Sequence, residues 1–275
     1  MHKMVVAKRA YGLFIRMGLC YFPKLRIVGG GKMRGFILGC VLLCMVMPVA
    51  AERVGVPVEL TTAYGTFFDA YEVGSEDSDQ SVLIIHDRWG LDNLALDWAD
   101  RFAKEGYLAL AIDLYDGRVA DKGDAAHAKA LIRQMAPEWV DANLKAAVKY
   151  LNSRPSRKVS VVGLGYGGAA AMRATVLEPF AIISTVNIFG RVPADTEDLR
   201  GINGPVLALF SDQDGWVGEK EIEAFEVMMF KLRNALQVAR IDAGQGFLDP
   251  EHSSYNKAEA ERVWNRAFTF VAETQ

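Results

Sequence analysis

A glycine-rich turn constrains this chain more than any other feature of its sequence. Residues 159–164 read Val-Ser-Val-Val-Gly-Leu, and Gly-Tyr-Gly-Gly-Ala follows at 165–169. A run of small residues with helical spacing then continues to Val176. A short β-branched run, clustered glycines and a helical pattern predict a buried strand, a tight turn and a helix.

Two motifs fit this turn. Gly163, Gly165 and Gly168 have the spacing of a dinucleotide fingerprint. Alternatively, Gly163 and Gly167 are the small residues of a nucleophile elbow whose central position is Gly165. The fingerprint normally follows the first strand and needs an acidic residue about 20 positions later, at the end of the next strand. Here several predicted strands precede the turn and the next one ends in Asn187-Ile188-Phe189, so dinucleotide binding remains a minor alternative.

The first 51 residues differ in composition from the rest of the chain. They contain eight Lys or Arg and no Asp or Glu, and an apolar run at 35–47 precedes Pro-Val-Ala-Ala at 48–51. A basic start, a short apolar run and small residues at the cut are typical of a secretory signal peptide. The run is shorter than the ~20 residues of a membrane span. We expect residues 1–51 to be a signal region, with translation starting at Met33; an uncleaved anchor is the alternative.

Removal of this region would leave residues 52–275 as a single domain in the periplasm or outside the cell, with no stable membrane insertion. All three cysteines (Cys20, Cys40 and Cys44) would leave with it, so no disulfide, thiolate ligand or cysteine nucleophile is expected in the mature part. The remaining 23 Lys and Arg beside 34 Asp and Glu give a net charge of −11. An acidic surface argues against a nucleic-acid partner. No His, Asp and Glu spacing suggests a metal site.

Strand-like and helix-like patterns alternate along the mature part. A hairpin is predicted over 54–72, strands at 81–87, 107–114, 159–164, 180–189, 205–211 and 236–241, and helices at 91–104, 124–135, 137–151, 217–234 and 256–271. Such alternation predicts an α/β fold with a mostly parallel sheet covered by helices on both faces. Ligands of such sheets bind outside the carboxyl ends of the strands.

Four stretches at these strand ends together resemble the dienelactone hydrolase family. They are Asp-Arg-Trp-Gly-Leu at 87–91, Ala-Lys-Glu-Gly-Tyr-Leu-Ala-Leu-Ala-Ile-Asp-Leu-Tyr at 103–115, Pro-Val-Leu-Ala-Leu-Phe-Ser-Asp-Gln-Asp at 205–214 and Gly-Gln-Gly-Phe-Leu-Asp-Pro at 244–250. The resemblance covers about residues 54–272 and implies an α/β-hydrolase fold. It also implies ester or lactone hydrolysis without a cofactor.

The resemblance places two degenerate residues in the catalytic triad. The nucleophile of the family, normally Cys, falls on Gly165, and its histidine base falls on Gln245. Its acid falls on Asp214, and a glutamate beside the nucleophile falls on the shorter Asp87. Glycine has no atom to attack a carbonyl, and an amide does not accept a proton near neutral pH. Whether the chain is an enzyme therefore stays open.

Four other residues are candidate substitutes for the missing groups. Tyr166 follows Gly165, but a phenol titrates near ~10 and an elbow directs this side chain away from the pocket. Ser211 ends a strand, and His86 and His252 lie near Asp87 and Gln245 in the sequence. A lone histidine is more often structural than catalytic, so none of the four is the preferred replacement.

The pocket itself is expected to persist. Backbone N–H groups of Arg88 and Tyr166 would still form an oxyanion hole, because that hole is made of main chain. Trp89, Trp216 and Phe247 are candidates for its walls, although ordinary core packing explains aromatic residues equally well. The sequence thus favours a catalytically impaired homologue that binds a small carboxylate or carbonyl compound; the alternative is an active hydrolase with non-standard residues.

Overall fold

The computed structural model describes residues 53–154, 158–193, 196–213 and 216–274. They build one eight-stranded sheet in the order β1-β2-β4-β3-β5-β6-β7-β8. The strands are β1 (Val56–Thr61), β2 (Phe67–Val73), β3 (Ser81–Ile85), β4 (Leu108–Ile112), β5 (Val159–Leu164), β6 (Ile182–Ile188), β7 (Val206–Ser211) and β8 (Leu236–Ile241). The pairs β1–β2 and β2–β4 are antiparallel. All other pairs, from β4–β3 to β7–β8, are parallel.

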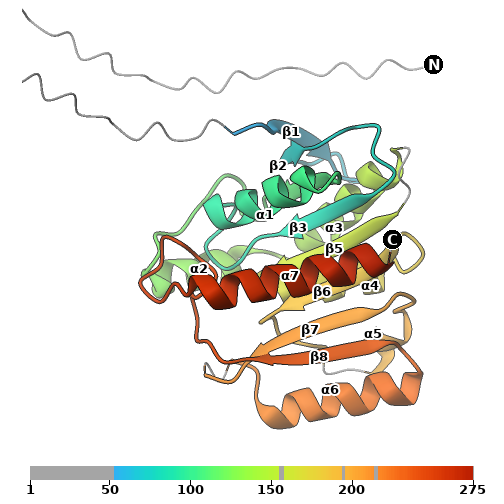
Figure 1. The fold of residues 1–275 in the computed structure, drawn as a ribbon. Helices are drawn as coiled ribbons and strands as arrows, with labels where there is room; N and C mark the ends of the chain where they lie inside the picture. Colours follow the sequence, from blue (N-terminus) through green and yellow to red (C-terminus); the bar gives the residue numbers. More distant parts are fainter. Residues whose placement is uncertain (1–52, 155–157, 194–195, 214–215, 275) are drawn as a thin grey trace, which may run out of the picture. The chain divides into compact units, whose positions relative to one another are not determined.

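Within these described residues, seven helices cover the two faces of the sheet (Figure 1). They are α1 (Asn93–Lys104), α2 (Ala125–Gln134), α3 (Pro137–Asn152), α4 (Tyr166–Leu177), α5 (Thr196–Arg200), α6 (Glu219–Leu232) and α7 (Lys257–Thr274). Apart from α5, each helix and strand was predicted from the sequence, with ends within a few residues. The mostly parallel α/β fold is therefore confirmed.

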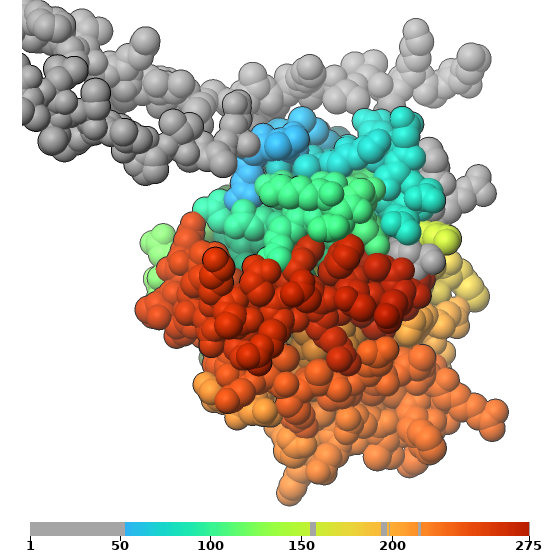
Figure 2. Space-filling view, viewed as in Figure 1, coloured from blue at the N-terminus to red at the C-terminus, as the bar shows by residue number. Residues whose placement is uncertain are grey.

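Helices α1 and α7 pack on one face of the sheet. Trp98 of α1 meets Trp264 of α7 edge to face, with ring centroids 5.1 Å apart, and Phe102 contacts the same indole at 4.8 Å. In Figure 2 the surface of α7 lies directly beside that of α1. These large rings bury much apolar area, which is the main source of stability for such a layer.

The other face is covered by α3, α4 and α6 in two clusters. One cluster joins β3, β4 and β5 to α3 and α4 through residues such as Leu83, Leu110 and Leu151. The second joins β7 to α6, with Phe210 and Phe225 fully buried. Strands β3 and β4 are buried along their whole length and, apart from Ser81, apolar, as expected for a sheet enclosed by helices on both faces.

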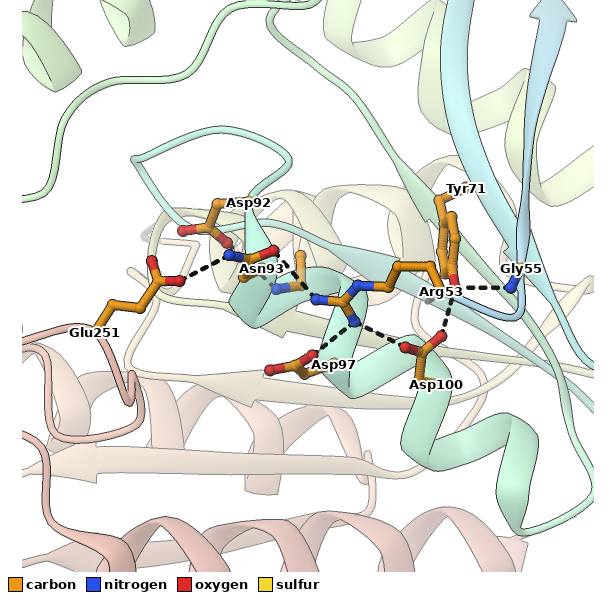
Figure 3. A network of polar contacts seen from close by, with 9 residues as sticks. Arg53, Gly55, Tyr71, Asp92, Asn93, Asp97, Asp100 and Glu251 are labelled. Carbon is orange, nitrogen blue, oxygen red and sulfur yellow. Dashed lines mark hydrogen bonds and ion pairs between the residues drawn. The ribbon is translucent and has the colours of Figure 1, made fainter. Parts of the chain in front are cut away.

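The described part of the chain begins with an anchored residue, Arg53 (Figure 3). Its Nη1 pairs with Asp97 Oδ1 at 2.6 Å and Asp100 Oδ2 at 2.7 Å, and its Nη2 donates to Asn93 Oδ1 at 3.1 Å. The Tyr71 hydroxyl donates to Asp100 at 2.6 Å. This network ties Arg53, the first described residue, to α1.

Candidate functional site

Gly165 forms the turn between β5 and α4 in the geometry of a nucleophile elbow. Its φ is 51° and its ψ is −115°, a conformation that L side chains rarely adopt. The small residues around it let the turn close: a Cβ on Gly163 would overlap the Gly167 carbonyl. The positive φ and this close approach favour the elbow interpretation over the dinucleotide fingerprint.

The carboxylate of Asp87 lies at the point where the sequence predicts an oxyanion hole. Its Oδ1 accepts hydrogen bonds from the backbone N–H of Arg88 at 2.6 Å and of Tyr166 at 2.8 Å. The sequence predicted that these two donors would converge, and they do, but on an oxygen of the protein itself. The donor of Tyr166 is at the first turn of α4, where the helix dipole favours a negative charge.

The same carboxylate takes the space that an elbow side chain would fill. A Cβ built on Gly165 would overlap Asp87 Oδ1 and lie within 3.0 Å of both its oxygens. Asp87 therefore accepts both N–H bonds and also fills the space into which a side chain at position 165 would extend.

A buried histidine holds the backbone of Asp87 in place. The Nε2 of His86 accepts from the Leu114 N–H at 3.1 Å, so the proton is on Nδ1, which donates to the Asp87 carbonyl at 2.6 Å. Burial lowers the pKa of His86, although the nearby Asp113 and Asp87 act in the opposite direction. A buried imidazole that is hydrogen-bonded through both of its nitrogens fits a structural role better than that of a free base.

A small pocket of about 40 Å³ opens beside Asp87 and Gly165. It is lined by strand ends and by the loop after β8, and its lining includes Asp87, Arg88, Trp89, Leu94, Leu164, Gly165, Ile188, Phe189, Trp216, Gln245, Gly246, Phe247, Leu248 and Asp249. All three predicted aromatic wall residues are among them. Phe247 also contacts Phe189, with the ring centroids 5.1 Å apart and the rings tilted by 34°.

Two guanidinium groups flank one wall of this pocket. The Arg88 guanidinium lies 5.3 Å from the centroid of Trp216 and 5.9 Å from that of Trp89. Arg191 lies 5.0 Å from the Trp216 centroid. The Nε of Arg88 is 3.8 Å from Asp87 Oδ1. These contacts hold positive charge close to the internal carboxylate.

The structure separates the remaining predicted residues. Gln245 is exposed and lines the pocket, whereas Asp214 lies outside the described residues.

Of the candidate substitutes, Tyr166 packs against Tyr115, with ring centroids 6.4 Å apart, and burial raises the pKa of Tyr166. The Ser211 hydroxyl donates to the Ala243 carbonyl at 2.5 Å, and His252 Nδ1 accepts from Ser254 N–H at 3.1 Å. Tyr166, Ser211 and His252 are not among the residues that line the described pocket.

Lys122 is a residue of the site region that the sequence did not reveal. Its Nζ pairs with Asp92 at 3.1 Å, with Glu251 at 3.3 Å and, most closely, with Asp249. Asp92 caps α1, while Asp249 and Glu251 follow Gln245 in the loop after β8. Lys122 thus connects three segments around the pocket. It lies in a loop without periodicity, so no sequence pattern marked it.

Within the described ranges, no group of His, Cys, Asp and Glu has a geometry suited to a metal ion. Likewise, none of the helices described there is long and apolar enough to cross a membrane. The apolar run at 35–47 falls outside these residues.

Comparison with known proteins agrees with this architecture. A relative named "Protein usf" from Aquifex pyrophilus is 28% identical over 203 residues, 70% of this chain and 87% of that protein. A relative from Saccharolobus solfataricus named as a carboxymethylenebutenolidase is 25% identical over 246 residues, 75% of this chain and 94% of that protein.

Solved structures share the fold at lower identity. A structure from Klebsiella pneumoniae, described as a dienelactone hydrolase, has a TM-score of 0.70 at 19% identity, covering 79% of this chain and 98% of the other. A dienelactone hydrolase from Anabaena variabilis gives 0.61 at 17%, covering 80% and 97%. The model of the dienelactone hydrolase family matches residues 68–275. This match spans most of the chain and agrees with the elbow and sheet order, so the chain belongs to the dienelactone hydrolase family, with its α/β-hydrolase fold.

Proposed function

We propose that this protein is a catalytically impaired member of its family that binds a small carbonyl or carboxylate compound without hydrolysing it. One observation carries the proposal: the Asp87 carboxylate accepts both oxyanion-hole N–H bonds at the place where an elbow side chain would begin. Acyl transfer needs a nucleophile and a base acting together. Gly165 and Gln245 supply neither.

The pocket retains features suited to ligand binding. Its walls combine aromatic rings with the Arg88 guanidinium and the exposed amide of Gln245, and such a mixture of apolar area and a few polar groups is typical of small-molecule sites. Its volume of about 40 Å³ favours small ligands. We therefore place small acids, esters and lactones first among candidate ligands.

A screen that records binding and turnover on the same samples tests this function. We expect at least one small acid, ester or lactone to raise the Tm of the wild-type protein and to be recovered unchanged after prolonged incubation. Arg88→Gln should reduce the shift, because Arg88 lines the pocket. The matched control is Arg133→Gln on the exposed side of α2. Recovery of hydrolysed product in proportion to the wild-type protein would contradict the proposal.

The position of Asp87 favours a second candidate, hydrolysis with Asp87 as a general base. Its carboxylate is beside the pocket and lies where the family nucleophile would be, so it could activate a water molecule toward an ester or lactone. This route has no free oxyanion hole while Oδ1 accepts both N–H bonds. Turnover that disappears in Asp87→Asn would support this candidate over the first.

We also propose that the protein is exported to the periplasm or beyond the cell. The basic start, the apolar run at 35–47 and Pro-Val-Ala-Ala at 48–51 support this. Mass spectrometry of the exported protein should find its N-terminus within a few residues of Glu52. Recovery of the intact N-terminal region from cytosolic protein would reject export.

A further inference from the structure

The oxyanion hole of this protein has the properties of an anion site. Two N–H groups from different segments, one after β3 and one at the start of α4, aim at a single point. The Arg88 Nε lies 3.8 Å from the oxygen at that point. Donors fixed in this way bind a negative oxygen strongly because they need no reorganisation when it arrives.

Asp87 reaches this site because Gly165 leaves the space open. A side chain on Gly165 would overlap the carboxylate, so the glycine and the aspartate depend on each other sterically. The Asp87 side chain is 20% exposed and lines the pocket. It is therefore accessible from the same space that a ligand would enter.

We infer that Asp87 is an internal ligand of this anion site, and that an external carboxylate binds the Arg88 and Tyr166 N–H groups only by displacing it. This inference rests on the proposed function and specifies how the ligand is held. Both N–H bonds go to one oxygen, so an incoming carboxylate oxygen and Asp87 Oδ1 cannot occupy the site together. The Arg88 guanidinium is close enough to receive the displaced carboxylate.

Competition of this kind predicts that the wild-type protein binds simple carboxylates weakly. Removing the internal carboxylate should free both donors and enlarge the pocket by the volume of the side chain. Asparagine at the same position should not, because its amide oxygen still accepts both N–H bonds at nearly the same size. The site therefore distinguishes Asp87→Ala from Asp87→Asn, although both remove one negative charge.

Acetate binding measured by calorimetry, together with amide NMR shifts of Arg88 and Tyr166, tests the inference. We expect Asp87→Ala to bind acetate at least tenfold more tightly than the wild-type protein, with shifts at both amides. Asp87→Asn should stay within about threefold of wild type. Asp121→Ala is the charge control, since Asp121 is an exposed aspartate in the loop before α2.

Three results would overturn the inference: no gain for folded Asp87→Ala, an equal gain for Asp121→Ala, or an equal gain for Asp87→Asn. If Asp87→Ala does not fold, Gly165→Ala replaces it, because its Cβ would force the carboxylate out of the site. Wild-type binding as tight as that of Asp87→Ala would reject displacement but leave the proposed function standing. Tight binding only in Asp87→Ala would support displacement and remove small monocarboxylates as wild-type ligands.

Discussion

The side chain of Asp87 fills the space that Gly165 leaves open at the elbow. A Cβ on Gly165 would overlap the carboxylate, while the carboxylate itself is held by the N–H groups of Arg88 and Tyr166. The glycine at the elbow and the position of the Asp87 carboxylate on the two N–H groups are therefore linked through one steric contact. This link makes several measurable predictions.

The first prediction concerns stability at the elbow. Gly165→Ala should lower the free energy of unfolding by about 1–3 kcal/mol, because of its positive φ and its overlap with Asp87. In an Asp87→Ala background the loss should shrink by about 1 kcal/mol, since the overlap has gone. Urea unfolding of the four proteins in this cycle measures the coupling.

Gly106→Ala is the matched control for this cycle. Gly106 also has a positive φ, of 95°, but a Cβ there would meet nothing within 4 Å. Its effect should be the same with and without Asp87. Equal losses for Gly165→Ala in both backgrounds would show that the carboxylate is not in the way.

The second prediction concerns Lys122. Replacing it by Met would leave the buried carboxylates of Asp92 and Asp249 without their cation. Removing one partner of such a buried group is strongly destabilising, so we expect a loss of about 3 kcal/mol in urea unfolding. Lys129→Met, at an exposed position of α2, should cost less than about 0.5 kcal/mol. Similar losses for the two variants would contradict a role for Lys122 in holding the loops together.

The third prediction concerns acid sensitivity. Burial lowers the pKa of His86 in the folded protein, whereas in the unfolded chain an ordinary histidine binds its proton near ~6.5. The unfolded state therefore gains a proton first, and stability should fall as pH drops below that value. The slope from this one group is at most about 1.4 kcal/mol per pH unit.

Between about pH 7.5 and 5, a window set by the pKa of the unfolded histidine, the stability of His86→Asn should depend less on pH than that of the wild-type protein. At the upper end of this pH window the variant should be less stable than the wild-type protein. His127→Asn, which removes an exposed histidine, should follow the wild-type curve. A His86→Asn protein whose stability falls as steeply as wild type would assign the acid sensitivity to other groups.

Much of the fold was predictable because its signals are local. Continuous apolar runs mark the buried strands, and apolar residues at helical spacing mark α1, α6 and α7. The glycines at 163, 165 and 167 mark the elbow. Helix α5 was missed because five residues are too few to show a helical period. The convergence of Arg88 and Tyr166 followed from the main chain alone.

The occupant of the oxyanion hole was not predictable in the same way. The sequence shows that Asp87 is near the elbow, but not which way its side chain turns. That direction depends on His86, which fixes the Asp87 carbonyl, and on the empty space at Gly165. The contacts of Lys122 were not predictable from the sequence either, because its three carboxylate partners lie in segments far from it along the chain.

The fourth prediction asks whether the catalytic machinery can be rebuilt. If Gly165 and Gln245 stand at the nucleophile and base positions that the sequence resemblance implies, Gly165→Cys with Gln245→His would restore the family residues there, and Asp214, outside the described residues, is the expected acid. Because the side chain introduced by Gly165→Cys would compete with Asp87 for space, adding Asp87→Ala should speed hydrolysis of an activated aryl ester further. Free oxyanion donors can lower the activation barrier by about 3 kcal/mol. Each single change should do little, because nucleophile and base act as a unit.

Asp214→Asn in the rebuilt protein should reduce the rate. A rate indifferent to Asp214→Asn would reject Asp214 as the third member. A well-folded triple variant with no activity above wild type would mean that Gly165 and Gln245 do not stand at the nucleophile and base positions.

Hydrolysis of activated aryl esters and lactones by the wild-type protein tests the central claim most directly. If, as we propose, none of the described pocket residues acts as nucleophile or base, the rate should equal the uncatalysed background and should not change in Asp87→Asn. Wild-type turnover above background that Asp87→Asn abolishes would contradict the claim and identify Asp87 as a catalytic residue.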